Sequence, residues 1–375
     1  MRPGDRRGVR SPGQTAAPPC GNGGTMTLLR KARILVTGCA GTVGRNLVAE
    51  LLAGEYRPAE VLGVDNNESE IFFQEQEHLG RPGVHFRLGD VRDAACLHQL
   101  FKGIDVVLHC AGYKHVVMCE RAPFDAVQTN VHGVQNVILA ATANNVRRVL
   151  FTSTDKAVNP TNVMGTSKLM GERLMTAANS TYRGEGTLFS STRFGNVLCS
   201  RGSVIPIFAE QIRRGGPVTV TDERMTRFIM SVEESARLVL DSVDLMCGGE
   251  VFVTKMPVIR ILDLAAVMIE ELAPRFGHDP AAVRIASVGS KPGEKLYEEL
   301  LTTEETRRAI ELDRYFAITP AFRGIYRDIE YRYPGQIERP VERPYLSESE
   351  PCLDREALRQ LLRSRGLLDE AAGAP

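Results

Sequence analysis

Short apolar runs alternate with helix-forming segments along the first half of this chain. Five runs have the length and composition of buried strands, at residues 33–38, 61–65, 84–90, 105–110 and 149–153. Segments with apolar residues at helical spacing lie at 43–52, 124–143 and 165–178. Buried strands that alternate with helices form a parallel sheet with helices on both faces. The sequence therefore predicts an α/β fold built on a doubly wound parallel sheet.

Charge and cysteine usage exclude several classes of protein. The 375 residues hold 46 basic and 46 acidic side chains, so the net charge is zero and argues against a nucleic-acid binder. No apolar run approaches the roughly 18 residues of a membrane span. The eight cysteines are scattered without a C-x-x-C pair, which is typical of reduced cytoplasmic thiols rather than of a disulfide framework or zinc site. We expect a cytoplasmic protein with neither a membrane span nor a metal.

The motif Gly38-x-x-Gly41-x-x-Gly44 stands where the first predicted strand meets the first predicted helix. Glycine lets the backbone turn tightly and approach a pyrophosphate, which the helix N-terminus attracts. Asp65 ends the next predicted strand, where a carboxylate can accept hydrogen bonds from ribose hydroxyls; the alternative is a simple turn. The pattern predicts a Rossmann-type domain that binds NAD(P). The acid favours NAD, because it would repel a 2′-phosphate, although Asn66 and Asn67 leave NADP open.

The sequence predicts that the chain has three parts. Residues 1–28 are predicted to be a disordered extension, since the first 25 hold six glycines and four prolines. Residues 29–198 form the predicted NAD(P)-binding domain. Residues 199–375 are predicted to be a smaller, mainly substrate-binding region, with some segments returning to the first domain. In the second half of the chain, strands are expected at 186–198 and 218–221. Helices are expected at 232–243, 261–272 and 355–362.

A polar cluster, Ser153-Thr154-Asp155-Lys156, ends the fifth predicted strand. Ligands of open α/β sheets bind beyond the carboxyl ends of the strands. Asp155 and Lys156 place an acid beside a base, as a reaction that moves protons requires. A turn with an N-cap acid is the alternative.

Longer strings make the chain resemble the extended short-chain dehydrogenase/reductase superfamily and, more narrowly, the UDP-N-acetylglucosamine 4,6-dehydratases of polysaccharide biosynthesis. The wider resemblance rests on the glycine motif, His109-Cys110-Ala111-Gly112, Asn130 and the helical Lys168. The narrower one rests on the strings at 114–116, 153–165, 193–197, 200–206, 216–221, 225–228 and 291–295. The resemblance covers roughly residues 31–310.

One position departs from the wider superfamily. Most members carry a tyrosine four residues before the helical lysine, and here that residue is Met164, which holds no proton. Several members of the narrower family share this methionine. The resemblance implies that Lys156 takes the proton from sugar C5, Asp155 helps expel water, and Thr154 hydrogen-bonds the C4 oxygen. We expect burial or a nearby cation such as Lys168 to lower the pKa of Lys156.

The resemblance also implies two sets of binding residues. The catalytic positions are Thr154, Asp155, Lys156, Met164 and Lys168, and Lys168 would also bind the nicotinamide ribose. The cofactor would contact Thr37, Gly38, Gly41, Thr42, Val43, Gly44, Asp65, Asn66, Asp90, Val91, Cys110, Ala111, Gly112, Asn130 and Lys168. The substrate would contact Lys114, Asn196, Arg201, Ser203, Thr219, Thr221, Arg227 and Glu294, with the two arginines on its diphosphate.

The resemblance thus implies a UDP-N-acetylglucosamine 4,6-dehydratase, or an enzyme of a close UDP-hexosamine, that makes a 4-keto-6-deoxy sugar for glycan synthesis. Two alternatives stay open, a nucleotide-sugar 4- or 5-epimerase and a non-catalytic dinucleotide-binding protein. The missing tyrosine favours the last, and the Asp155–Lys156 pair disfavours it. Relatives form dimers to hexamers, so a homo-oligomer is expected.

Overall fold

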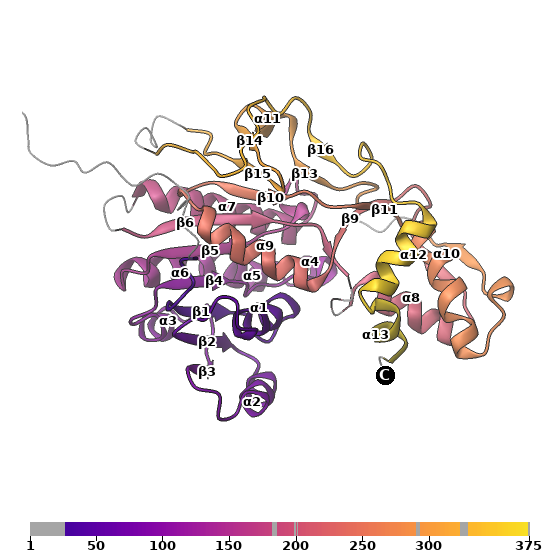
Figure 1. Ribbon diagram of the computed structural model, residues 1–375, viewed down its shortest axis with the longest axis horizontal. Coiled ribbons are helices and arrows are strands. Elements are labelled where there is room, and N and C mark those ends of the chain that lie inside the picture. The colour runs from indigo at the N-terminus through magenta and orange to yellow at the C-terminus, as the bar shows by residue number, and fades with distance from the viewer. Residues whose placement is uncertain are drawn as a thin grey trace, which may run out of the picture.

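A nine-stranded sheet forms the centre of the computed structural model, which describes residues 27–181, 186–198, 200, 202–289, 293–322 and 329–373 (Figure 1). The strands stand in the order β14-β15-β10-β6-β5-β4-β1-β2-β3. All neighbours from β10 to β3 are parallel, whereas β15 and β14 are antiparallel additions. In chain order the strands are β1 Arg33–Thr37, β2 Glu60–Asp65, β3 Val84–Leu88, β4 Val106–His109, β5 Arg148–Thr152, β6 Leu188–Arg193, β10 Val251–Thr254, β14 Ala309–Glu311 and β15 Tyr315–Ile318.

The five strands predicted from apolar runs are β1 to β5. Their side chains alternate between two cores, because successive residues of a strand point to opposite faces. Ile34 and Val36 belong to the core under helices α1, α2 and α9, while Leu35 belongs to the core under α3, α6 and α7. The predicted doubly wound parallel sheet is therefore confirmed.

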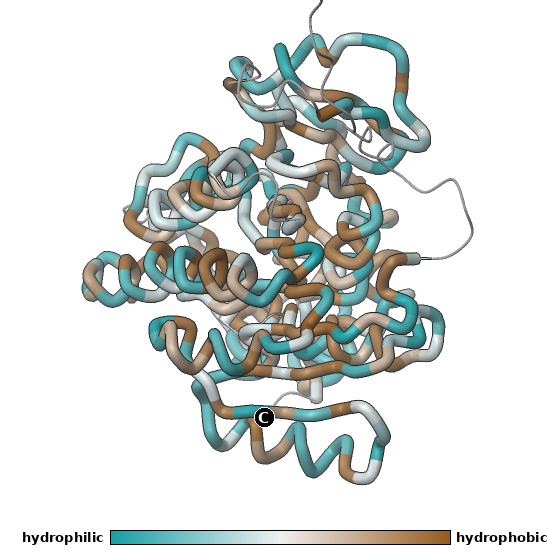
Figure 2. Tube along the Cα trace, turned by 90° about the vertical axis from the view of Figure 1, so that its left-hand side faces the viewer, coloured by the Kyte–Doolittle hydropathy of each residue, from teal (hydrophilic) through white to brown (hydrophobic). Residues whose placement is uncertain are grey.

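Six helices cover the two faces of the sheet. Figure 2 shows hydrophobic and hydrophilic residues alternating along the helices, as expected for helices that bury one face. The six are α1 Thr42–Leu52, α2 Glu68–Glu77, α3 Ala94–Leu100, α6 Gly133–Ala143, α7 Val163–Thr181 and α9 Val232–Leu245.

A second, smaller core lies beside the carboxyl end of the sheet, where four helices gather in Figure 1. These are α8 Val204–Arg213, α10 Ile261–Leu272, α12 Arg355–Ser364 and α13 Leu367–Gly373. Short sheets connect this lobe to the first, through β7 Asn196–Val197, β8 Val218–Val220, β9 Thr226–Met230, β11 Val258–Arg260, β12 Ile285–Ser287, β13 Glu299–Leu301 and β16 Tyr345–Leu346. Within the described ranges, no helix is long and apolar enough to cross a bilayer.

Two predicted elements are interrupted. The helix predicted over 124–143 is three pieces, α5 Pro123–Val127, a π-helical turn at Gln128–His132 and α6. The strand predicted over 186–198 is β6 and β7, which belong to different sheets. Gly195 separates them, because a Cβ atom there would lie 2.7 Å from Cβ of Phe228, so the backbone passes too close to β9 to continue in the central sheet.

The predicted N-terminal extension falls almost wholly outside the described residues. Its last residue is already attached to the fold, since the N–H of Leu28 donates to Asp244 Oδ1 at 2.8 Å. Leu29 beside it is fully buried.

Candidate active site

The glycine motif forms a tight turn between β1 and α1. Gly38 has φ +72°, and a Cβ atom there would lie 2.6 Å from the backbone nitrogen of Ala111. A Cβ atom on Gly44 would lie 2.1 Å from the Gly38 carbonyl oxygen. Gly41 is the N-cap of α1, and no side chain among the described residues caps this helix. The N–H groups of Thr42 and Val43 thus begin a helix that can face an anion.

Asp65 ends β2, and Asp90 lies two residues after the end of β3; both carboxylates have protein partners. Asp65 closes the glycine turn, since its carboxylate accepts the N–H groups of Ala40 and Asn67, each at 3.0 Å. Asp90 lies 2.6 Å from the Arg92 guanidinium, which lowers the pKa of the carboxyl to about 2. Asn66 Nδ2 donates to Asp90 at 3.3 Å, so these two predicted cofactor-binding residues are in contact.

The residues after β4 meet those of α7. The Cys110 N–H donates to the Thr37 carbonyl at 3.1 Å, and Asn130 Oδ1 accepts the Tyr113 N–H at 2.8 Å. Asn130 Nδ2 donates to Ser167 Oγ at 2.9 Å, from the π-helical turn that interrupts the predicted helix. A Cβ atom on Gly112 would lie 3.0 Å from Asn130 and 3.1 Å from the Lys168 amine. The lack of a side chain at Gly112 therefore lets Asn130 and the Lys168 amine lie close to the backbone after β4, where the nicotinamide is predicted to bind.

Lys168 and Met164 lie one turn apart on α7, and both are buried. The Lys168 amine donates to the Thr152 carbonyl at 3.1 Å, and burial lowers its pKa to about 8. Met164 packs in an apolar cluster with Cys119 and Ala126. Because Met164 carries no acidic proton, it cannot take the part of the tyrosine that most members of the wider superfamily place four residues before this lysine.

A cavity of about 400 Å³ lies between the carboxyl end of β5 and the second lobe. Eight of the predicted catalytic and substrate-binding residues line it, namely Asp155, Lys156, Asn196, Ser203, Thr219, Thr221, Arg227 and Glu294. Lys114, Thr154, Met164 and Lys168 are not in its wall. Arg201, predicted to bind the diphosphate, lies outside the described residues. The fold thus brings these eight residues, which are spread over about 140 positions of the chain, together around one cavity.

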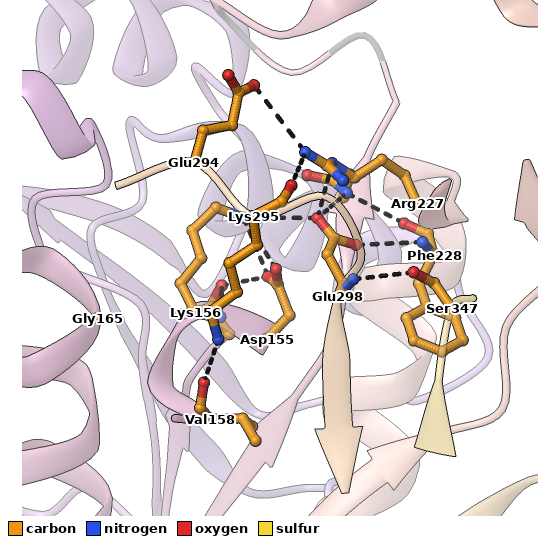
Figure 3. Close-up of polar contacts among 12 residues, drawn as sticks. Asp155, Lys156, Val158, Gly165, Arg227, Phe228, Glu294, Lys295, Glu298 and Ser347 are labelled. Carbon is orange, nitrogen blue, oxygen red and sulfur yellow. Dashed lines mark hydrogen bonds and ion pairs between the residues drawn. The ribbon is translucent and has the colours of Figure 1, made fainter. Parts of the chain in front are cut away.

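Asp155 and Lys156 form an ion pair in this wall, with Nζ 3.0 Å from Oδ2 (Figure 3). Burial would raise the pKa of Asp155, but the Lys156 charge and hydrogen bonds from Thr154, Lys156 and Glu298 outweigh burial and lower it. Burial would likewise lower the pKa of Lys156, but the charges of Asp155 and Glu298 raise it. The expected lowering of the Lys156 pKa is therefore wrong for the cavity as it stands, because carboxylates rather than cations surround the amine.

Thr154 is also committed to this pair. Its hydroxyl donates to Asp155 Oδ1 at 2.7 Å and accepts the Lys156 N–H at 3.4 Å. Thr154 therefore orients the Asp155 carboxyl. To donate a hydrogen bond to the C4 oxygen of the sugar, as predicted, the Thr154 hydroxyl would have to give up its hydrogen bond to Asp155.

Arg227 lies in the same polar wall as the pair, with its side chain 13% exposed. Its guanidinium donates to the backbone carbonyls of Thr226, Leu296 and Lys295, at 2.8, 3.1 and 2.9 Å. These bonds fix the segment around Glu294 against β9. Thr219 is held similarly, since its hydroxyl accepts from Gln211 at 2.7 Å.

Glu298 was not predicted from the sequence, and it lies at the centre of the polar wall (Figure 3). Asn196 Nδ2 donates to Oε1 at 2.7 Å, and the Phe228 N–H donates to Oε2 at 3.1 Å. Arg227 Nε lies 3.3 Å and Lys156 Nζ 3.9 Å from Oε1. Burial and the charge of Asp155 raise the pKa of Glu298 to about 7. The only sequence signal was its place three residues after the string at 291–295, which does not separate it from Glu299.

Among the described residues, no group of three or more His, Cys, Asp or Glu side chains is arranged to hold a metal ion.

Residues 34–320 match the model of a family described as polysaccharide biosynthesis protein. An uncharacterized membrane protein of Methanocaldococcus jannaschii is 49% identical over 288 residues, which are 76% of this chain and 85% of that one. The inverting UDP-N-acetylglucosamine 4,6-dehydratase of Campylobacter jejuni is 36% identical over 305 residues, or 81% and 87%. A UDP-glucose 4-epimerase of Rickettsia bellii is 34% identical over 345 residues, or 90% and 97%.

Two solved structures share the fold. Pen from Bacillus thuringiensis aligns with a TM-score of 0.83 and 36% identity over 91% of this chain and 99% of its own. The dTDP-glucose 4,6-dehydratase DesIV of Streptomyces venezuelae, with NAD and TYD bound, aligns with a TM-score of 0.61 and 25% identity over 70% and 86%.

The sheet, the glycine turn and the lysine of α7 define an enzyme of the short-chain dehydrogenase/reductase kind. Within that class, the chain belongs to the polysaccharide biosynthesis protein family.

Proposed function

We propose that this enzyme is an NAD(P)-dependent UDP-N-acetylhexosamine 4,6-dehydratase that converts its substrate to a 4-keto-6-deoxy sugar. The observation that carries the proposal is the Asp155–Lys156 pair, which faces a cavity whose other walls come from the predicted substrate-binding strings. The Campylobacter relative of that name supports the choice of reaction. The cavity, about 400 Å³, suits a small-molecule substrate.

The described residues fit a dinucleotide. Gly38 and Gly44 leave space that a side chain would fill, and the uncapped start of α1 can bind the pyrophosphate. Asp65 would reach the adenosine ribose, which favours NAD, and Lys168 would reach the nicotinamide ribose. The nicotinamide, when bound, would accept hydride from sugar C4 and return it to C6.

The residues of the chain supply the proton transfers. A ketone at C4 acidifies the hydrogen on C5, and Lys156 takes that proton once its amine is neutral. Asp155 then gives a proton to the departing C6 hydroxyl, which leaves as water. Because Lys156 is held as a cation beside two carboxylates, it becomes a base only when its own proton moves to one of them. The ion pair of 3.0 Å is short enough for that transfer.

A 4-epimerase is the second candidate, and one observation favours it. The Rickettsia relative of that name matches 345 residues of this chain, more than the 305 matched by the dehydratase relative. Both reactions begin with oxidation at C4, so only the later steps separate them.

The proposal is tested with the variants Asp155→Asn and Lys156→Ala, assayed with UDP-N-acetylglucosamine and NAD. Each should lower formation of 4-keto product at least about 100-fold and leave cofactor binding intact. Lys255→Ala is the matched control, because Lys255 forms a similar ion pair with Glu311, at 2.8 Å, outside the cavity. Wild-type rates in both cavity variants would refute these roles. Cofactor binding by a wild-type protein that makes no keto sugar would instead indicate the non-catalytic alternative.

A further inference from the structure

Lys295 lies in the wall of the cavity, and no role was predicted for it from the sequence. It is the last residue of the string at 291–295, and its side chain is half-buried. Its ammonium donates a hydrogen bond to the Val158 carbonyl oxygen at 2.7 Å (Figure 3). Val158 directly follows the 3₁₀-helical turn Asp155–Ala157, which carries the Asp155–Lys156 pair. This bond therefore ties the turn to a segment 137 positions further along the chain.

We propose that Lys295 is a positioning residue, which holds the turn Asp155–Ala157 in the place where the Asp155–Lys156 pair can reach the sugar. The segment that carries Lys295 also carries Glu294, which is predicted to contact the substrate. Figure 3 shows the side chains of Glu294 and Lys295 leaving this segment in opposite directions. Lys295 thus couples the substrate-binding segment to the acid and the base. This inference rests on the proposed dehydration and assigns a residue that acts through the pair.

The other supports of the turn come from the first lobe. The Asp155 N–H donates to the Phe194 carbonyl at 3.2 Å, just beyond the end of β6. A Cβ atom on Gly165 would lie 2.1 Å from the Lys156 carbonyl oxygen, so the backbone of α7 packs directly against the turn. The Val158 carbonyl, at the far end of the turn, is held from the second lobe by Lys295. The pair is therefore fixed by both lobes together.

The backbone of Lys295 is itself fixed, as the support for a positioning side chain must be. Arg227 donates to the Lys295 carbonyl at 2.9 Å, which anchors the segment to β9. Asn162, shortly after the turn, donates through Nδ2 to the Gly293 carbonyl at 3.3 Å. The segment at 293–299 is thus attached to β9 on one side and to the start of α7 on the other.

The chemistry of the bond suits this role. An ammonium makes a stronger hydrogen bond to a carbonyl than a neutral donor does. Because the Lys295 amine donates to a backbone carbonyl, the Asp155 carboxylate stays with Lys156, 3.0 Å from its amine. Burial lowers the pKa of Lys295, while the charges of Glu299 and Asp155 oppose that effect and favour the cation. Lys295 can therefore hold the turn without drawing the acid away from the base.

The test is steady-state kinetics of wild type, Lys295→Met and Lys295→Arg with UDP-N-acetylglucosamine and NAD. Lys295→Met should lower kcat about 10- to 100-fold with KM within about 3-fold, because the pair is displaced while the substrate still binds. Lys295→Arg should recover kcat to within about 5-fold of wild type, since a guanidinium also donates to the Val158 carbonyl. Substrate deuterated at C5 should show a larger isotope effect in Lys295→Met than in wild type, because removal of the C5 proton becomes the slow step.

Glu299→Ala is the matched control. Glu299 accepts a hydrogen bond from Asn159 Nδ2 at 2.6 Å, so this contact joins the same two segments, but neither residue lines the cavity. The variant should keep kcat within about 3-fold of wild type and leave the isotope effect unchanged. Thermal unfolding of Glu299→Ala and Lys295→Met measures how much of any effect is a general loss of stability.

A further readout does not depend on activity. The N–H groups of Ala157 and Val158 donate to the Thr154 and Asp155 carbonyls, at 3.1 and 3.0 Å, and these two bonds define the turn. Amide hydrogen exchange at these two positions should be faster in Lys295→Met than in wild type and in Glu299→Ala, because the turn has lost its support from the second lobe.

Four outcomes decide between the explanations. An unchanged kcat or unchanged amide exchange in Lys295→Met overturns the positioning role, as does an equal loss of kcat in Glu299→Ala. A raised KM with kcat unchanged in Lys295→Met also overturns it, and indicates instead that Lys295 binds the diphosphate directly. Absence of any keto product in wild type overturns the proposed function, and amide exchange at Ala157 and Val158 then decides whether Lys295 holds the turn.

Discussion

A Cβ atom on Gly38 would lie 2.6 Å from the backbone nitrogen of Ala111, on the neighbouring strand-to-helix connection. The glycine turn after β1 and the loop after β4 are therefore in direct backbone contact. This contact between Gly38 and Ala111 fixes the two loops relative to each other. The predicted pyrophosphate-binding and nicotinamide-binding surfaces, which these loops carry, are therefore fixed relative to each other as well.

Gly38→Ala should abolish dinucleotide binding, measured by titration of NAD against protein fluorescence or calorimetry. The new methyl group would collide with the backbone of Ala111. In addition, the φ of +72° is a left-handed conformation that is unfavourable for alanine. Gly80→Ala separates these two causes, because Gly80 has φ +76° with nothing within 4 Å of its Cβ position. It should cost only about 1–2 kcal/mol of stability and leave NAD affinity unchanged. Equal loss of NAD affinity in the two variants would contradict this account of the turn.

Met164→Leu should keep kcat within about 3-fold of wild type and cost less than about 1.5 kcal/mol of stability. Met164 is 3% exposed and packs against Cys119 and Ala126, so its role is to fill volume. Steady-state kinetics and thermal unfolding measure both quantities. A folded variant with kcat reduced 100-fold would show that the sulfur has a chemical role.

Arg193→Met should lower the free energy of unfolding by about 3–5 kcal/mol, because it removes the buried cation that Glu172 and Glu305 share. The guanidinium lies 2.7 Å from Glu172 and 2.9 Å from Glu305, with all three side chains buried. This triad joins β6 to α7 and to the segment after β13. Arg275→Met, which breaks an exposed pair with Asp369, should have little effect on denaturant unfolding. Similar losses in the two variants would contradict the assigned role of burial.

The contribution of Glu250 to the free energy of unfolding should fall as pH rises from about 4.5 to 7, and Glu250→Gln should remove that contribution. Burial raises the pKa of Glu250 to about 7, while the unfolded chain releases this proton near 4.5. In that window the folded state binds more protons, so rising pH favours unfolding, by about 3 kcal/mol for this group. Denaturant unfolding at about pH 5 and pH 8 measures the difference. The same difference in wild type and Glu250→Gln would refute the shift.

The sequence predicted the parallel core well because its strands are continuous apolar runs and its glycine turn obeys local rules. The π-helical turn at Gln128–His132 has no local signal, since it depends on Asn130 meeting Tyr113 and Ser167 from other elements. The split between β6 and β7 depends on the approach of Phe228 to Gly195.

Some residues of the candidate site could likewise be predicted from the sequence, and one could not. Asp155 and Lys156 were found because they are adjacent and follow a strand. Glu298 lies 142 positions after Lys156 and is brought to it only by packing of the second lobe, so its raised pKa and its place 3.9 Å from the Lys156 amine could not be read from spacing. The pKa direction of Lys156 was mispredicted because the carboxylate of the adjacent Asp155 and, from the second lobe, that of Glu298 outweigh burial and favour the cation.

The central claim is that this cavity removes water from a UDP-hexosamine after oxidising C4. The most direct measurement is the mass and NMR spectrum of the product formed from UDP-N-acetylglucosamine and NAD in deuterated water. The account predicts a sugar lighter by one water, with deuterium at C5 and a methyl group at C6. A product that has lost no water, with its C5 hydrogen unexchanged, would contradict dehydration and indicate the 4-epimerase instead.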